Sequence, residues 1–293
     1  MNDNSVWTVR RMMQWSTQWL GEKEIENPRL DTELLLSHSL GIRRLDLFLD
    51  MDRPLIAEEL AAFKTLIKRR VAREPVAYIT ESKGFWTLDL TVKSGVLIPR
   101  PETELVVDTI LKTITQRDTV LRILEIGVGT GAIILSLLKE LPEAEGVGVD
   151  ISEQAIACCT ENAENLGLDK RLKLHHGDLF EPLNASQQRY DILVSNPPYV
   201  LDSELEGLEP EVRQWEPKTA LLGGAEGLDI YKRLLADAVD YLNEHGKIAV
   251  EIGCTQAEAV TRLMEGAGFC EVTVLKDYSG HPRVVTGQKK SDQ

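Results

Sequence analysis

The sequence predicts an α/β protein in which a doubly wound, Rossmann-like and mostly parallel sheet follows a small helical N-terminal domain. After residue 101, short buried runs alternate with helical stretches, a pattern typical of parallel sheets with crossover helices. Up to about residue 73, apolar residues instead recur at helical spacing. The expected strands are Arg122–Ile126, Gly146–Val149, Leu172–His175, Asp191–Ser195, Lys247–Glu251 and Glu271–Leu275.

These patterns divide the chain into three parts. Residues 1–75 are expected to form a helical domain, in which Asn27-Pro28 and Arg53-Pro54 mark helix starts. Residues 76–100 are expected to form a β-hairpin linker, because short β-like runs there are separated by glycines. Residues 101–293 hold the sheet, and the acidic stretch 201–218 within them is expected to be an irregular loop.

The composition is that of a globular protein of 293 residues, with 33 Lys plus Arg against 47 Asp plus Glu. The net charge of −14 would repel a polyphosphate surface, so we expect no direct nucleic acid partner. The cysteines Cys158, Cys159, Cys254 and Cys270 lack C-x-x-C spacing, which argues against a metal site and indicates buried thiols in a reducing compartment. No stretch approaches the roughly 18 apolar residues of a membrane span. We therefore expect a cytoplasmic monomer without a membrane partner.

A glycine-rich loop follows the first expected strand. The loop Gly127-Val128-Gly129-Thr130-Gly131 permits a tight turn and lets a ligand approach the backbone before the next helix begins. Its G-x-G-x-G spacing differs from the dinucleotide form and fits a cofactor without a pyrophosphate, such as S-adenosyl-L-methionine. The alternative is a strand-to-helix turn that binds nothing.

Two acidic residues follow the next strands. Asp150 stands nineteen residues after Gly131, close to the spacing at which an acidic residue meets ribose hydroxyls in nucleoside-binding folds. Asp178, in a turn after the third strand, could accept a hydrogen bond from an adenine amine while Leu179 covers the ring. A helix cap or turn is the competing interpretation of Asp178.

The tetrapeptide Asn196-Pro197-Pro198-Tyr199 ends the fourth expected strand and suits methylation of a planar nitrogen. The Asn196 side-chain oxygen can accept one N–H bond of such a substrate. Pro197 restrains the backbone, so a carbonyl oxygen here can be held rigidly as a second acceptor, and Tyr199 offers a flat face for stacking. The alternative is a turn that terminates the strand.

The positions of these motifs support one another. Gly127, Asp150, Asp178 and Asn196 all follow strands directly, and open α/β sheets bind ligands at the carboxyl ends of their strands. Asn196 is therefore expected at the cofactor as well as at the substrate. The segment 99–104 could form a wall of this pocket with carboxylates that complement a sulfonium cation, or could simply start a helix.

Taken together, the motifs resemble the PrmC/HemK family of peptide chain release factor glutamine methyltransferases. The resemblance covers nearly the whole chain. It is carried by the stretches Arg73–Ile79, Val96–Glu104, the G-x-G-x-G loop, Ser195–Val200, Glu216-Pro217, Glu251-Ile252-Gly253, Asp277–Gly280 and Arg283-Val284-Val285. Three departures stand out: Glu125 where an Asp is commoner, Leu179 where some members have an aromatic residue, and Thr80-Glu81-Ser82 without the expected glycine.

The resemblance implies a helical substrate-recognition domain over 1–75, a hairpin link, and a class I S-adenosylmethionine-dependent methyltransferase domain over 101–293. It implies methyl transfer to the side-chain amide of the glutamine in the Gly-Gly-Gln motif of release factors, which act in translation termination. Residues 127–131 and Asp150 would hold the cofactor, Leu179 would lie beside the adenine, and residues 196–199 would hold the glutamine amide. The alternatives are an adenine or guanine amine of nucleic acid as substrate, and a cofactor-binding regulator without turnover.

Overall fold

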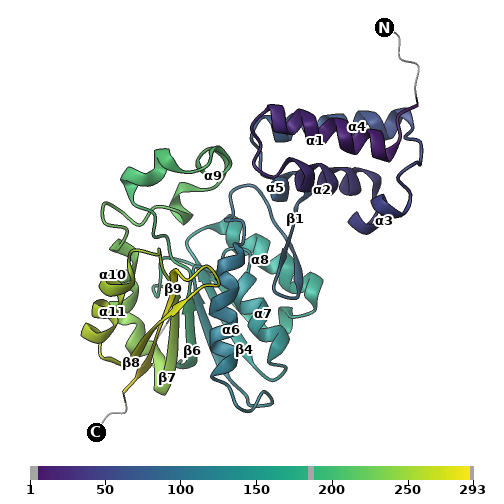
Figure 1. Cartoon of the computed structure of the whole chain (residues 1–293). Coiled ribbons are helices and arrows are strands. Elements are labelled where there is room, and N and C mark those ends of the chain that lie inside the picture. The colour runs from purple at the N-terminus through teal and green to yellow at the C-terminus, as the bar shows by residue number, and fades with distance from the viewer. Residues whose placement is uncertain (1–5, 184–187, 291–293) are drawn as a thin grey trace. The chain divides into compact units, whose positions relative to one another are not determined.

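The computed structural model describes residues 6–183 and 188–290, and these residues divide into two compact units (Figure 1). The helical unit comprises the chain up to Ser82 together with the short segment Glu209–Trp215. The sheet unit comprises Lys83–Leu208 and the chain from Glu216 onward. The chain therefore enters the helical unit a second time, shortly after the Asn196-Pro197-Pro198-Tyr199 motif.

The helical unit is built around a core of leucine, isoleucine and phenylalanine side chains, in which α2 packs against both α1 and α4. Local signals fix the helix ends. The Thr8 side chain accepts a hydrogen bond from the Arg11 N–H at the start of α1, and Gly41 ends α2 in the left-handed region. The helices are α1 Val9–Glu22, α2 Pro28–Leu40, α3 Arg44–Leu49, α4 Ala57–Val71, α5 Val76–Thr80 and α9 Pro210–Trp215.

An ion-pair cluster within the helical unit secures α9. The guanidinium of Arg70 is almost wholly buried and donates to Asp31 at 2.6 Å and to Glu211 of α9 at 2.8 Å. Arg73 adds a second, longer contact with Glu211 at 3.4 Å. The expectation of an irregular loop over 201–218 is therefore wrong, because this stretch contains α9 and the 3₁₀ turns Asp202–Gly207 and Lys218–Ala220.

The sheet unit begins with a hairpin of β1 (Ser82–Phe85) and β2 (Leu88–Thr91). Glu81 takes a positive φ of 52° just before it, so a non-glycine residue makes the turn where the sequence lacks glycine. The described residues of this unit also form a seven-stranded sheet of order β5-β4-β3-β6-β7-β9-β8. The strands are β3 Arg122–Ile126, β4 Glu145–Asp150, β5 Leu172–His176, β6 Tyr190–Ser195, β7 Leu242–Glu251, β8 Phe269–Lys276 and β9 Pro282–Lys289.

The first five strands of this order are parallel, while β9 is antiparallel to β7 and β8 antiparallel to β9. All six strands expected from the sequence are confirmed, as is the mostly parallel sheet. The sequence does not predict β9, because its last expected strand ends at Leu275. The parallel pairing matters for function because it brings the ends of β3, β4, β5 and β6 to one edge of the sheet.

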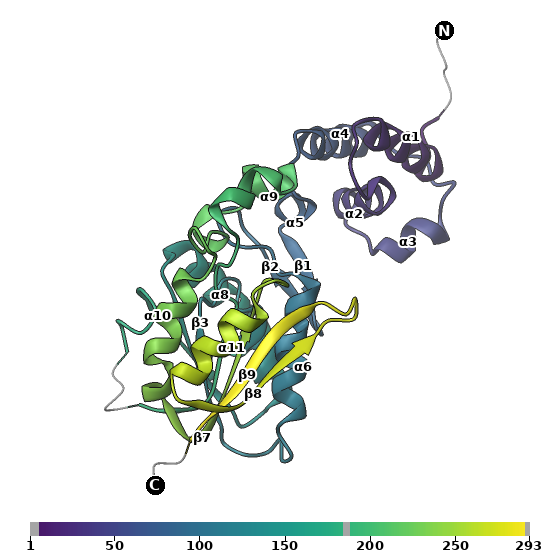
Figure 2. The ribbon, with the colours of Figure 1, turned by 60° about the vertical axis from the view of Figure 1, so that its left-hand side comes forward.

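Helices cover both faces of the sheet, because alternate strand residues enter different cores. On β6, Ile192 and Val194 pack with α6, α7 and α8, while Leu193 packs with α10 and α11. Figures 1 and 2 show α6 and α11 on opposite faces of the sheet. The helices are α6 Glu104–Lys112, α7 Ala132–Glu140, α8 Glu153–Leu166, α10 Asp229–Ala238 and α11 Ala257–Gly266.

Candidate active site

A pocket of about 360 Å³ lies at the carboxyl ends of the parallel strands, within the sheet unit. It brings together the motifs that the sequence places after β3, β4, β5 and β6. The predicted site residues that line it are Gly127, Gly129, Asp150, Asp178, Leu179, Asn196, Pro197 and Pro198. Apolar side chains such as Val96 and Ile151 complete the wall, so one face suits a flat, apolar ring.

Asp150 holds the glycine loop in shape. Its Oδ2 accepts a hydrogen bond from the Gly129 N–H at 2.8 Å, and its Oδ1 accepts one from the Ser152 N–H at 2.9 Å. Burial raises the pKa of the Asp150 carboxyl, and these two N–H donors oppose that rise. A carboxylate has about four acceptor positions, so Asp150 can still receive hydroxyl donors from the pocket side.

The remaining residues of the loop lie behind its pocket face. Val128 and Thr130 are buried, and neither lines the pocket. Gly131 has a φ of 83°, and a Cβ added there would stand 2.7 Å from the Cys159 Sγ. These three residues therefore support the loop through packing and backbone conformation.

The segment after β5 contributes one acidic and one apolar residue. Asp178 Oδ2 accepts a hydrogen bond from Arg233 at 2.7 Å, so part of its capacity is used within the protein. Leu179 lines the pocket with a φ of 49°, a region that non-glycine residues seldom occupy. Such a backbone is held by its surroundings and is found preferentially at ligand sites.

The amide of Asn196 is held in a defined orientation. Its Nδ2 donates to the Thr103 Oγ1 at 3.2 Å, and its Oδ1 accepts no hydrogen bond from any described residue. The Pro197 carbonyl oxygen is also without a donor among the described residues. Two acceptor groups are thus available in adjacent residues of the pocket wall.

Tyr199 is fixed behind this wall. Its hydroxyl donates to Glu251 Oε1 at 3.3 Å, and its carbonyl accepts from Gln256 Nε2 at 3.0 Å. Burial, followed by the charge of Glu251, raises the pKa of the Tyr199 hydroxyl, so it stays protonated at neutral pH. A Cβ added at Gly227 would stand 2.4 Å from the Tyr199 carbonyl oxygen, so close packing also immobilises the backbone here.

The segment 99–104 does not line the pocket, whose wall comes instead from residues 95–97 just before it. Its Glu104 accepts a hydrogen bond from the Trp86 N–H at 2.8 Å. Glu125, the departure from the family pattern, is buried and accepts from the Ile134 N–H of α7 at 2.9 Å. Burial raises the pKa of Glu125 well above its ordinary value. Glu125 therefore caps a helix and is absent from the pocket lining.

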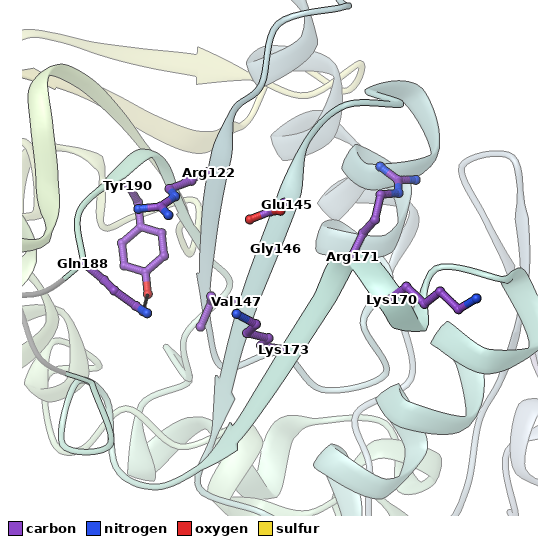
Figure 3. A pocket seen from close by; sticks show the side chains of 9 residues that line it. All are labelled: Arg122, Glu145, Gly146, Val147, Lys170, Arg171, Lys173, Gln188 and Tyr190. Atoms are coloured by element: carbon purple, nitrogen blue, oxygen red, sulfur yellow. Dashed lines mark hydrogen bonds between the residues drawn. The ribbon is translucent and has the colours of Figure 1, made fainter.

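A second hollow, of about 70 Å³, lies at the amino ends of the parallel strands (Figure 3). Several of its lining residues are basic, but the view shows Arg122 on one side and Lys170 and Arg171 on the other. Arg171 is already used, because it donates to three carbonyl oxygens at the end of α7 and just beyond it. None of the predicted site residues lines this hollow.

The cysteines differ in part from expectation. Cys158 and Cys159 are buried, but Cys254 is exposed and Cys270 is half-buried, so the expectation of buried thiols holds for only two of them. Within the described ranges, no group of three or more His, Cys, Asp or Glu residues could hold a metal ion. None of the helices in these ranges is long and apolar enough to cross a membrane.

Two family models match the chain. One, described as the PrmC N-terminal domain, matches residues 11–80. The other, described as a methyltransferase domain, matches residues 118–212.

Among solved structures, a methyltransferase from Pyrococcus furiosus has a TM-score of 0.52 and 19% sequence identity. The match covers 76% of this chain and 98% of that chain. The Thermus thermophilus 16S rRNA N2 G1207 methyltransferase has a TM-score of 0.53 and 20% identity, covering 71% of this chain and 50% of its own. These two likenesses show the methyltransferase fold.

Curated relatives match over almost the full length. The release factor glutamine methyltransferase of Geobacter sulfurreducens is 45% identical over 283 residues, which is 97% of this chain and 97% of that protein. The release factor glutamine methyltransferase of Caulobacter vibrioides is 43% identical over 270 residues, which is 92% of each chain. The chain therefore belongs to the family of release factor glutamine methyltransferases.

Proposed function

We propose that this enzyme transfers a methyl group from S-adenosylmethionine to the side-chain amide nitrogen of the glutamine in the Gly-Gly-Gln motif of release factors. The observation that carries the proposal is the orientation of Asn196. Because Nδ2 is held by Thr103, the oxygen Oδ1 is left as an acceptor, and the Pro197 carbonyl oxygen is free in the next residue. A primary amide has two N–H bonds to give to these two acceptors.

The pocket residues fit S-adenosylmethionine. Gly127 and Gly129 have no side chains, so the ligand can approach the backbone of the loop. Asp150 still has carboxylate lone pairs that could accept hydrogen bonds from the ribose hydroxyls. Leu179 would cover the adenine, and Asp178 would accept from its amine through the carboxylate oxygen that Arg233 does not hold. The volume of about 360 Å³ lies in the range of small-molecule sites. When bound, this cofactor supplies an electrophilic methyl group on a sulfonium.

The protein contributes mainly by positioning. Asn196 Oδ1 and the Pro197 carbonyl would hold the two N–H bonds and so fix the direction of the nitrogen lone pair. Tyr199, which the sequence predicts as a stacking face, does not line the pocket and would support these acceptors from behind the wall. The nitrogen would become positively charged as its bond to the methyl carbon forms and the bond from that carbon to the sulfonium sulfur breaks, whose electron pair stays on sulfur as a neutral thioether. The same two acceptors would stabilise the charge on nitrogen. The excess proton then leaves the nitrogen to water, which yields the neutral methylated amide.

We also propose that the helical unit recognises the body of the release factor, since one glutamine side chain cannot specify a protein. The support is its match to the PrmC N-terminal domain over residues 11–80. The net charge of −14 suits a partner with a basic surface, and we propose that the acidic residues Glu204, Glu206 and Glu209 contribute to that attraction. Methylation kinetics that do not change when all three are neutralised would contradict this last part.

The test is a transfer assay with labelled S-adenosylmethionine, a purified release factor, its Gln-to-Ala variant, and DNA and RNA in parallel. We expect label only in the unmodified release factor. Asn196→Ala should abolish transfer while cofactor affinity, measured by calorimetry, stays nearly unchanged. Asn243→Ala is a matched control, because this amide donates to Asp191 at 2.7 Å near the opposite end of β6 and β7. Label in nucleic acid, or full activity of the Asn196 variant, would refute the assignment.

A further inference from the structure

A buried carboxylate lies directly behind the motif that holds the substrate. Glu251 is the last residue of β7 and is only 1% exposed. Its Oε1 accepts a hydrogen bond from the Tyr199 hydroxyl. Its Oε2 is buried and accepts no hydrogen bond from any described residue. Burial of a carboxylate with an unpaired oxygen lowers the free energy of unfolding, so a functional reason for Glu251 is expected.

Glu251 is connected to both ends of the tetrapeptide. Tyr199 donates to it directly, and the Thr103 side chain, in the neighbouring 3₁₀ turn Pro101–Thr103, faces it closely enough to lower its pKa. The same Thr103 hydroxyl accepts from Asn196 Nδ2. A chain of side chains therefore runs from Asn196 through Thr103 to Glu251 and on to Tyr199.

The direction of hydrogen bonding in this chain depends on Glu251. An ionised carboxylate can only accept, so it attracts the single proton of the Thr103 hydroxyl toward itself. The oxygen of that hydroxyl then accepts from Nδ2 of Asn196, and the amide is held with Oδ1 directed away from Thr103. Reversal of this order would present Nδ2, a donor, to the two N–H bonds of the substrate.

We propose that Glu251 is a positioning residue for methyl transfer, which sets the orientation of the Asn196 amide through Thr103 and anchors Tyr199 at the same time. This inference rests on the proposed function, because it concerns the acceptor that the glutamine amide needs. Glu251 acts from behind the wall and does not line the pocket.

The charges around Glu251 give the proposal a pH signature. Burial raises the pKa of Glu251 to about 7, against the opposing effects of Thr103, Arg283 and Tyr199, while Glu102 raises it further. Tyr231 also faces it and donates to its backbone carbonyl at 2.7 Å. Below pH 7 the protonated acid no longer requires Thr103 to donate, so the turnover rate should fall. The substrate amide itself does not titrate in this range.

The experiment compares wild type, Glu251→Gln, Thr103→Val and Thr103→Ser as full-length proteins with a release factor substrate. Glutamine offers one acceptor oxygen in place of two, and valine removes the link to Asn196. Both variants should lower kcat by roughly 10- to 100-fold while the Kd for S-adenosylmethionine, measured by calorimetry, changes little. Thr103→Ser keeps the hydroxyl and should restore kcat to near the wild-type value.

The pH profile separates positioning from a merely structural role. Wild-type kcat should rise from about pH 6 to about pH 8, and this rise should be missing in Glu251→Gln. A wild-type kcat in Glu251→Gln, or an unchanged pH profile in that variant, would overturn the inference while leaving the proposed function intact. Absence of glutamine methylation by the wild type would instead overturn the proposed function.

Discussion

The substitution Glu251→Gln should stabilise the protein at high pH, although it removes a residue that we place in support of catalysis. The carboxyl has an ordinary pKa of 4.5 and a folded-state pKa of about 7, and the first cause of the rise is burial. Between these two values the folded protein binds more protons than the unfolded chain. The free energy of unfolding therefore falls as pH rises through this window and is level above it.

The size of the effect follows from the shift in pKa. A difference of about 2.5 units corresponds to roughly 3 kcal/mol at high pH, and about 2 kcal/mol of this should develop between pH 5.5 and 8. Glutamine does not titrate, so the variant lacks this loss. Any change in packing or hydrogen bonding that glutamine introduces shifts the variant by a nearly constant amount at every pH.

Urea unfolding of wild type and Glu251→Gln at several pH values between 5.5 and 8 provides the measurement. The difference between the two free energies cancels the titration of other groups, including Asp150, whose pKa is also raised by burial. We expect the difference to move by about 2 kcal/mol in favour of the variant over this range. A difference that stays constant within about 0.5 kcal/mol would refute the raised pKa and the cost of the buried charge.

Three further substitutions test other parts of the structure. Asp150→Asn should weaken S-adenosylmethionine binding by roughly 10- to 100-fold in calorimetry, because an amide has one acceptor oxygen instead of two; unchanged affinity would exclude Asp150 from the cofactor site. Gly131→Ala should lower the free energy of unfolding by about 2 kcal/mol, because its φ is 83° and the new methyl would meet Cys159; a neutral effect in urea would contradict the packing. Arg70→Met should lower the free energy of unfolding by about 3 kcal/mol, because it removes the cation from the buried Asp31 and the partly buried Glu211; an unchanged urea midpoint would contradict that pairing.

Much of the fold was predictable because it depends on local patterns. The strands of the sheet carry short buried runs between turn residues, and the glycine loop and the tetrapeptide Asn196-Pro197-Pro198-Tyr199 follow directly after two of them. Parallel pairing then places these ends together without any further information. The pocket could therefore be predicted, as could eight of the 24 residues that line it.

The contacts that orient the site could not be predicted in this way, because they join residues far apart in the chain. Thr103 and Asn196 are 93 positions apart, and Arg70 and Glu211 are 141 apart. From the sequence alone, Thr103 after a proline-rich turn is interpreted as part of a helix start, and Glu211 as one more residue of an acidic stretch. Only their contacts in three dimensions show that Thr103 orients the Asn196 amide and that Arg70 and Glu211 hold α9.

The position of α9 links these observations. The chain leaves the tetrapeptide, contributes Glu211 to the buried ion-pair cluster of the helical unit, and returns at Glu216. There the Glu216 carboxylate accepts from the Ile98 N–H at 3.1 Å and from Arg100, which holds the chain just after the pocket wall of residues 95–97. The stretch between the tetrapeptide and the pocket-lining residue Pro217 is therefore anchored twice, by Glu211 within the helical unit and by Glu216 within the sheet unit.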